Sequence, residues 1–233
     1  MSAIHPQIPF EFPLQKAFSL ENFVVGANQA VVEQLQHQFD EDYEPLLYLW
    51  GTGAAGCSHL LQAACQSATT KGRTAIYLPM DEIKWLDPVM LQGIENVDLI
   101  CLDHLQAVAG LVDWEEALFH LFNRVLQQRI CLLVGASSPP RGVGIALADL
   151  QSRFMSCAIF QVMSLEDVDK VLLLQEQASE KGIELHQDAA QYILNRSQRS
   201  TDALLEILES LDRSSLSAGR KLTIPFIKQS MGW

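Results

Sequence analysis

Four short apolar segments recur along the first part of the chain. They are Leu46–Trp50, Thr74–Leu78, Val97–Leu102 and Ile130–Val134, and each is nearly continuous rather than alternating with polar residues. Continuous apolar runs of this length are typical of strands that are covered on both faces. A fifth run, Ala158–Val162, predicts one more strand of the same sheet.

Helical patterns lie between these strands. They cover Ser58–Thr70, Asp81–Gly93 and Trp114–Gln128, and Asp113 with Glu116 predicts a capping box at the start of the last one. Strands that alternate with helices predict βαβ units, and therefore an α/β fold with a mainly parallel five-stranded sheet.

After Met163 only helical patterns remain. Ser164 is the predicted N-cap of the first helix and Gly182 its C′ residue, and Pro225 suits a first turn. The predicted helices are Glu166–Lys181, Gln187–Arg196, Ser200–Leu216 and Pro225–Met231. We therefore expect a proline-rich extended tail over residues 1–16, an α/β core over 17–162 and a helical domain over 163–233.

Composition narrows the class of protein. Apolar residues make up 48% and charged residues 19%, an ordinary globular mixture. No segment approaches the ~18 apolar residues of a membrane span, and the first residues lack the features of a secretory signal, so we expect a cytoplasmic protein that does not contact membrane. With 16 basic and 28 acidic residues the net charge is −12, which disfavours direct DNA binding. The 5 cysteines form no C-x-x-C pair and predict buried reduced thiols rather than a metal site.

A glycine-rich segment follows the first predicted strand. Gly51, Gly53, Gly56 and Ser58 have the spacing of a P-loop, in which backbone N–H groups surround phosphate at a helix N-terminus and the hydroxyl contacts Mg²⁺. Cys57 stands where that motif has lysine, so the charge that neutralises the β- and γ-phosphates is missing. The alternative interpretation is a glycine-rich turn that binds nothing.

The third predicted strand ends in an acid. Asp103 at the end of this apolar run fits a Walker-B pattern, in which the carboxylate holds the metal. His104 occupies the position where a hydrolysing ATPase has glutamate. Since Cys57 and His104 both depart from the motif, we expect no independent ATP turnover.

Several stretches carry a family resemblance. Residues 18–28 (FSLENFVVGAN) and 119–123 (FHLFN) resemble the AAA+ domain of the bacterial replication initiator DnaA. Ser138-Pro139-Pro140 followed by residues 150–154 (LQSRF) resembles the stretch that ends in the arginine finger of that family. Residues 211–226 resemble the Hda family of short DnaA homologues, which inactivate the initiator. The resemblance implies an AAA+ αβα core and a helical lid.

The same resemblance assigns roles to individual residues. Arg153 would act as an arginine finger in trans and stimulate hydrolysis of ATP bound to the DnaA initiator; the alternative is a surface arginine paired with Asp149. Val24, Val25 and Asn28 would line a nucleoside pocket or pack between the first segment and the lid. ADP and Mg²⁺ are the implied ligands. Asp202 stands where the family has a sensor arginine, with Arg199 the nearest substitute, which puts nucleotide dependence in question.

The tail carries one further motif. The hexapeptide by which Hda binds the sliding clamp, the β subunit of DNA polymerase III, resembles the segment that contains Gln7, Ile8, Phe10 and Phe12. The alternative is a tail that folds back on its own core. The resemblance thus implies a clamp-tethered negative regulator of replication initiation that inactivates DnaA. Two other functions stay open: an autonomous nucleotide switch or NTPase, and a clamp-associated structural adaptor. A homodimer is also possible as the oligomeric state.

Overall fold

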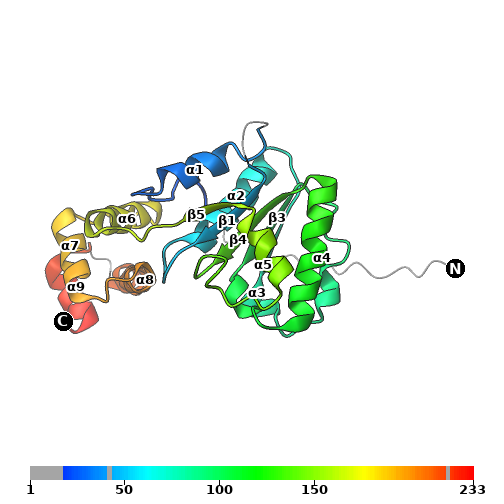
Figure 1. The fold of residues 1–233 in the computed structure, drawn as a ribbon. Coiled ribbons are helices and arrows are strands. Elements are labelled where there is room, and N and C mark those ends of the chain that lie inside the picture. The colour runs from blue at the N-terminus through cyan, green and yellow to red at the C-terminus, as the bar shows by residue number, and fades with distance from the viewer. Residues whose placement is uncertain (1–17, 41–43, 219–220) are drawn as a thin grey trace.

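A five-stranded sheet forms the centre of the molecule (Figure 1). The computed structural model describes residues 18–40, 44–218 and 221–233. All neighbouring strands pair in parallel, in the order β2-β3-β4-β1-β5. The strands are β1 (Leu46–Trp50), β2 (Ala75–Pro79), β3 (Leu99–Asp103), β4 (Cys131–Ala136) and β5 (Ala158–Gln161). The predicted α/β fold with a parallel five-stranded sheet is confirmed. Each predicted apolar run matches one strand, and the ends agree to within two residues.

The two faces of the sheet are covered by different helices. Leu47 and Leu49 of β1 pack with α1 and α2, whereas Tyr48 between them packs with α4 and α5. These helices are α1 (Gln29–Gln36), α2 (Cys57–Thr70), α4 (Val112–Gln128) and α5 (Ala148–Met155). Since successive strand residues point to opposite faces, the alternating contacts make the sheet the middle of three layers. Figure 1 shows α1 and α2 on one side of the strands and α4 and α5 on the other.

The C-terminal helices have an apolar core of their own. Leu174, Ile193, Leu208 and Ile227 are fully or almost fully buried in it, one from each helix. The helices are α6 (Asp167–Glu180), α7 (Gln187–Arg196), α8 (Thr201–Ala218) and α9 (Ile224–Met231), on the left in Figure 1. Gly182 has a φ of 72°, in the left-handed region, as its predicted C′ position requires.

The prediction of one helix over Asp81–Gly93 is wrong. The segment forms a single turn, α3 (Met80–Ile83), and a separate 3₁₀ helix, η1 (Pro88–Leu91). Pro88 cannot donate a backbone hydrogen bond and disfavours helical backbone at the residue before it. The Asp87 carboxylate accepts a hydrogen bond from the Val89 N–H at 2.9 Å and so begins the second piece.

Two predicted helix starts are also wrong. Helix α4 begins at Val112 after an N-cap at Leu111, so Asp113 lies in its first turn and does not cap it. Helix α6 has Glu166 rather than Ser164 at the N-cap, and the Glu166 N–H donates to Oδ2 of Asp169 at 3.4 Å. Helices α1, α5 and η2 (Leu105–Ala107) lie outside all the predicted helices. Within the described part of the chain no helix combines the length and apolarity needed to cross a bilayer.

Candidate functional site

The loop between β1 and α2 has the backbone of a P-loop. Gly53 and Gly56 have φ values of 60° and 102°, which side chains with a Cβ rarely adopt. At Gly51 a Cβ would lie 2.6 Å from the Cβ of Ala55 and 2.8 Å from the carbonyl oxygen of Val162. At Gly56 a Cβ would lie 2.9 Å from Cε2 of Phe23, so glycine is required at Gly51 and Gly56 and favoured at Gly53. Helix α2 begins immediately after Gly56, with its first N–H groups facing the loop.

A cavity of about 550 Å³ lies against this loop. The segment before α1, the end of β3 and the lid helices α6 and α8 complete its walls. The predicted nucleotide-site residues that line it are Val24, Gly51, Gly53, Gly56, Cys57, Ser58 and Asp103. Val25 does not line it, because its side chain packs against the apolar cluster of α1 and α2. The volume is in the ordinary range for a small-molecule pocket.

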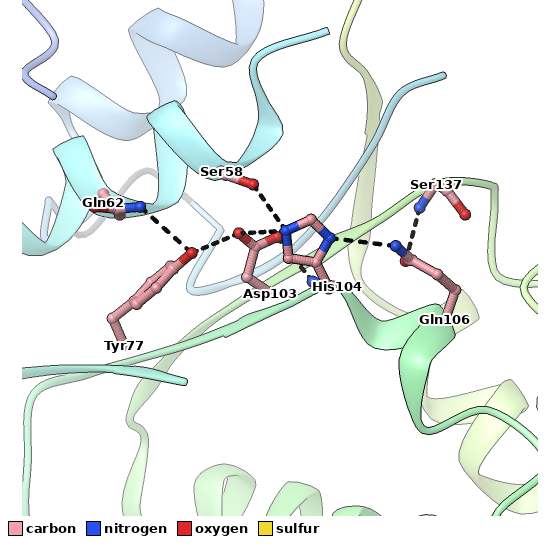
Figure 2. Close-up of polar contacts among 7 residues, drawn as sticks. All are labelled: Ser58, Gln62, Tyr77, Asp103, His104, Gln106 and Ser137. Carbon is pink, nitrogen blue, oxygen red and sulfur yellow. Dashed lines mark hydrogen bonds and ion pairs between the residues drawn. The ribbon is translucent and has the colours of Figure 1, made fainter. Parts of the chain in front are cut away.

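Asp103 is buried and held from two sides (Figure 2). Its side chain is 2% exposed, and Oδ2 accepts a hydrogen bond from the Tyr77 hydroxyl at 2.7 Å. The backbone N–H of His104 donates to Oδ1 at 2.8 Å. Gln62 of α2 donates from Nε2 to the Tyr77 oxygen at 3.4 Å, so the carboxylate is fixed by a chain of side chains that starts on the P-loop helix.

Side chains from two other segments contact His104 (Figure 2). The Ser137 N–H donates to Oε1 of Gln106 at 3.0 Å, which turns the Gln106 NH₂ group toward Nδ1 of His104 at 3.3 Å. An amide nitrogen only donates, so this contact favours Nδ1 as the acceptor. Nε2 faces Oγ of Ser58 at 3.4 Å and Oδ2 of Asp103 at 3.7 Å.

The residue that replaces the P-loop lysine carries no charge. Burial, followed by the nearby Asp103, raises the pKa of the Cys57 thiol to about 12. At neutral pH the side chain is therefore a neutral thiol, and it adds neither a cation for phosphate nor a thiolate for metal binding.

The charges around the cavity do not fit a polyphosphate. Among the described residues that line it there is no lysine or arginine, while Asp103 and Asp202 are both present. Asp202 lies in the first turn of α8 and is exposed. Arg199 lies outside the lining and pairs with Asp167 at 2.7 Å. The described residues also contain no group of three or more His, Cys, Asp or Glu side chains placed to hold a metal ion.

Arg153 lies apart from this cavity, in the last turn of α5. Its side chain is half-buried, and within the described ranges its guanidinium makes no hydrogen bond or ion pair, with Asp149 or with any other residue. The clamp-motif residues Gln7, Ile8, Phe10 and Phe12 lie outside the described residues.

Several residues that shape the site were missed by the sequence analysis. Tyr77, Gln62 and Gln106 hold Asp103 and His104, but nothing in their local sequence marks them. Asn28 was predicted as a nucleoside-pocket residue but does not line the cavity. Its side chain accepts a hydrogen bond from the N–H of Met163 at 2.7 Å and donates one to the Met163 carbonyl oxygen at 2.9 Å, which joins the first segment to the end of the core. Only the three-dimensional pairing of distant segments reveals these contacts.

Comparisons with known proteins agree with this geometry. Residues 14–161 match the family model of the bacterial DnaA ATPase domain, and residues 167–231 match that of the Hda lid domain. Domain III of the replication initiation protein DnaA from Thermotoga maritima has 20% identity and a TM-score of 0.79, with 94% of this chain and 98% of that chain covered. AMPPCP-bound DnaA from Aquifex aeolicus has 23% identity and a TM-score of 0.72, with 94% and 69% covered. The RuvB protein of Thermotoga maritima has 17% identity and a TM-score of 0.70, with 92% and 71% covered.

The parallel sheet, the P-loop and the helical lid together define an AAA+ protein. The chain belongs to the family of the bacterial DnaA ATPase domain, whose model covers more than half of it. With its Hda-type lid it is an Hda-like, DnaA-related replication regulator.

Proposed function

We propose that this protein inhibits replication initiation by supplying Arg153 in trans to ATP bound by the DnaA initiator. The observation that carries the proposal is that Arg153 has no polar partner among the described residues and lies outside the cavity of its own chain. Its five N–H donors are therefore left for a partner molecule. A guanidinium that meets the charge developing on a γ-phosphate raises the rate of hydrolysis by roughly 10³–10⁵ in GTPase systems.

Exposed apolar residues that follow Arg153 in the sequence are consistent with docking of a protein partner. Met155 at the end of α5 and Ile159 on β5 are 38% and 44% exposed. Exposed apolar side chains and arginine are both enriched at protein interfaces. The initiator would cover this surface when Arg153 enters its nucleotide site.

The tail motif supplies the second part of the proposal. Gln7, Ile8, Phe10 and Phe12 resemble the clamp-binding hexapeptide, and binding to the sliding clamp on DNA would raise the local concentration of Arg153 near the initiator. The net charge of −12 favours this indirect route to DNA over direct contact with phosphates.

The proposed mechanism requires no turnover in this chain. Cys57 and His104 replace the lysine and the glutamate that ATP hydrolysis needs, so the chain would complete the active site of a partner without hydrolysing ATP itself. ADP and Mg²⁺ are implied by the family resemblance alone, and the finger acts whether or not this chain holds them. We expect the protein to act in the cytoplasm.

The finger is tested on initiator preloaded with radiolabelled ATP, in the presence of clamp loaded on nicked circular DNA. The native chain should accelerate conversion to ADP, and Arg153→Ala should remove the acceleration. Arg153→Lys keeps the charge but loses the planar fork, so it should restore only a small part. Arg141→Ala is the matched control, because Arg141 is exposed and lies outside α5. Acceleration that survives Arg153→Ala would remove this residue from the mechanism.

The tether is tested in the same assay with and without clamp. Gln7→Ala should lower the stimulation to the level seen without clamp and leave Arg153 competent at high protein concentration. Clamp binding with no effect on initiator-bound ATP would identify a structural adaptor. ATP hydrolysis by the isolated chain would identify an autonomous NTPase.

A further inference from the structure

A groove of about 600 Å³ lies between α4 and the segment that joins α3 to η1. Its described lining shares no residue with the cavity beside the P-loop. Two hydrogen bonds fix the joining segment on the helix. The indole N–H of Trp114 donates to the carbonyl oxygen of Lys84 at 3.1 Å, and Nη2 of Arg124 donates to that of Leu91 at 2.7 Å. Both ends of this wall of the groove are therefore anchored on α4.

The segment between the two anchors exposes its apolar side chains. Trp85 is 82% exposed, Leu86 43% and Val89 58%, and all three line the groove. Ile83 and Leu91 at the two ends of the segment are each 1% exposed, so the core takes its apolar residues from the ends and not from the middle. Exposed apolar side chains that gather in one concave surface are typical of a site for a partner.

The side of α4 that faces these residues is acidic. Five residues of the helix line the groove at the spacing of one helix face, namely Asp113, Glu116, Ala117, His120 and Arg124. Asp87 on the joining segment adds a third carboxylate, and all three acids are exposed. The groove thus has an apolar wall and an acidic wall.

The cations near the groove are already engaged. Among the described residues of the lining there is no lysine, and Nε of Arg124 lies 3.2 Å from Oε1 of Glu95. Lys84 lies outside the lining, with Nζ 4.9 Å from the centroid of the Trp85 ring. With histidine counted as neutral, the acids of the groove outnumber the cations that could offset them. This charge attracts a basic partner and repels the phosphates of nucleic acid or of a lipid surface.

We propose that this groove binds a short basic segment of a partner protein. An arginine of the segment stacks on Trp85, whose indole is a favourable surface for a guanidinium. A neighbouring basic side chain pairs with Asp113 and Glu116, and an apolar side chain packs on Leu86 and Val89. A groove of this volume holds a few side chains, so the partner contributes a peptide segment and not a broad domain face.

The proposal goes beyond the role proposed for Arg153. Neither Arg153 nor any described residue of the cavity beside the P-loop lines the groove. Binding at the groove is measured without initiator, clamp or ATP, so its failure and the failure of the arginine finger are separate results.

The test measures binding of a fluorescein-labelled hexapeptide of arginine and leucine (RLRRLR) to the full chain by fluorescence anisotropy. The same peptide with glutamate in place of arginine (ELEELE) and a labelled oligothymidylate should bind at least ~10-fold more weakly, because the acidic wall repels them. The lysine peptide (KLKKLK) keeps the charge but stacks less well on indole, so its affinity should lie between those of RLRRLR and ELEELE.

Substitutions in the groove separate this site from the general attraction of an acidic chain. Trp85→Ala and the double substitution Asp113→Asn/Glu116→Gln should each weaken binding of RLRRLR by at least ~5-fold. Glu33→Gln/Glu176→Gln is the matched control, because it removes the same charge from exposed positions on α1 and α6. It should leave the affinity within ~2-fold of the native value. Circular dichroism establishes that all variants fold.

Nuclear magnetic resonance of the indole N–H groups locates the bound peptide. RLRRLR should shift the signal of Trp85, assigned by its loss in Trp85→Ala, and leave that of Trp233 on the lid side unchanged. This result, together with weakening by the groove substitutions alone, supports the proposal.

Four results would overturn it. They are equal weakening in the Glu33→Gln/Glu176→Gln control, tighter binding of ELEELE or oligothymidylate than of RLRRLR, and no binding of RLRRLR up to millimolar concentration. The fourth is a Trp85 signal that moves with protein concentration alone, which would assign the groove to a second copy of this chain.

Discussion

The hydroxyl group of Tyr77 on β2 donates a hydrogen bond to Oδ2 of Asp103 on β3, with an oxygen–oxygen distance of 2.7 Å. The two strands pair in parallel with Pro79 opposite Asp103, so the bond crosses the sheet diagonally. Burial and the adjacent Asp103 raise the pKa of Tyr77 well above its usual range. Tyr77 therefore stays protonated at neutral pH and remains a donor to the buried carboxylate.

Removal of this hydroxyl should destabilise the fold. Tyr77→Phe leaves one oxygen of a buried carboxylate without its donor, and a hydrogen bond to a charged group contributes about 1.5–3 kcal/mol. The free energy of unfolding in urea should fall by that amount. Tyr192→Phe is the matched control, because the Tyr192 hydroxyl is buried and has no hydrogen-bond partner among the described residues. Its loss should leave stability unchanged or raise it, and equal losses in both variants would contradict the role given to Tyr77.

Glu115 connects α4 to the start of the helix that carries Arg153. Its carboxylate is 2% exposed and accepts hydrogen bonds from the N–H groups of Gly110 at 2.6 Å, Ala146 at 3.0 Å and Leu147 at 2.7 Å. Glu115→Ala removes the shared acceptor of these three N–H groups from a buried position and should lower stability by about 3 kcal/mol.

The neighbouring acid is the control for this prediction. Glu116 is exposed, so Glu116→Ala should change stability by less than about 0.5 kcal/mol. Because Leu147 is the N-cap of α5, Glu115→Ala should also reduce stimulation of initiator-bound ATP hydrolysis at a temperature where the variant is folded. Equal losses of stability in Glu116→Ala and Glu115→Ala would contradict the role given to the buried Glu115 carboxylate.

Gly135 allows the end of β4 to lie close to the site. A Cβ at this position would lie 2.7 Å from Oδ1 of Asp103 and 3.1 Å from Cδ2 of Leu61. Gly135→Ala should therefore displace the carboxylate and cost about 1–3 kcal/mol. At Gly142 the nearest atom would be 3.6 Å away, so Gly142→Ala should be neutral or slightly stabilising in the same thermal unfolding experiment. A neutral Gly135→Ala would show that β4 can move away from Asp103.

The elements that could be predicted from sequence are those that local pattern determines. The strands are continuous apolar runs because helices cover both faces, and the P-loop glycines are marked by their spacing. The prediction of one helix over Asp81–Gly93 was wrong because Pro88 and the cap at Asp87 interrupt the helical backbone. The proline after an aspartate was visible in the sequence and could have indicated the break.

The contacts that hold the site could not be predicted in the same way. Tyr77 meets Asp103 only because β2 and β3 are neighbours in a particular register. In the sequence, Glu115 is one of several acidic residues in a predicted helix. Its hydrogen-bond partners Ala146 and Leu147 are 31 and 32 residues away, so no local pattern indicates its role. Val25 shows the converse, since it neighbours Val24 in sequence but packs against α1 and α2 rather than the cavity.

His59 makes stability depend on pH in a direction that follows from its contacts. The carbonyl oxygen of Ser19 lies 2.9 Å from Nε2, and the ring packs on Phe18 and Phe23. Burial lowers the pKa of His59 below its ordinary value of 6.5, although the hydrogen bond to Ser19 and the carboxylate of Glu180 act in the opposite direction. In the folded protein the ring is thus neutral where the unfolded chain already binds a proton.

Stability should therefore be complete above pH 6.5 and fall as the pH drops below it, because the unfolded state then binds more protons than the folded state. His59→Gln keeps a donor for Ser19 but does not titrate, so the free energy of unfolding of the native chain should fall more than that of the variant between pH 7.5 and 5.5. His120→Gln is the control, since His120 is exposed and should leave the native pH dependence intact. Parallel pH profiles for the native chain and His59→Gln would mean that the imidazole takes up its proton equally well in the folded and unfolded states.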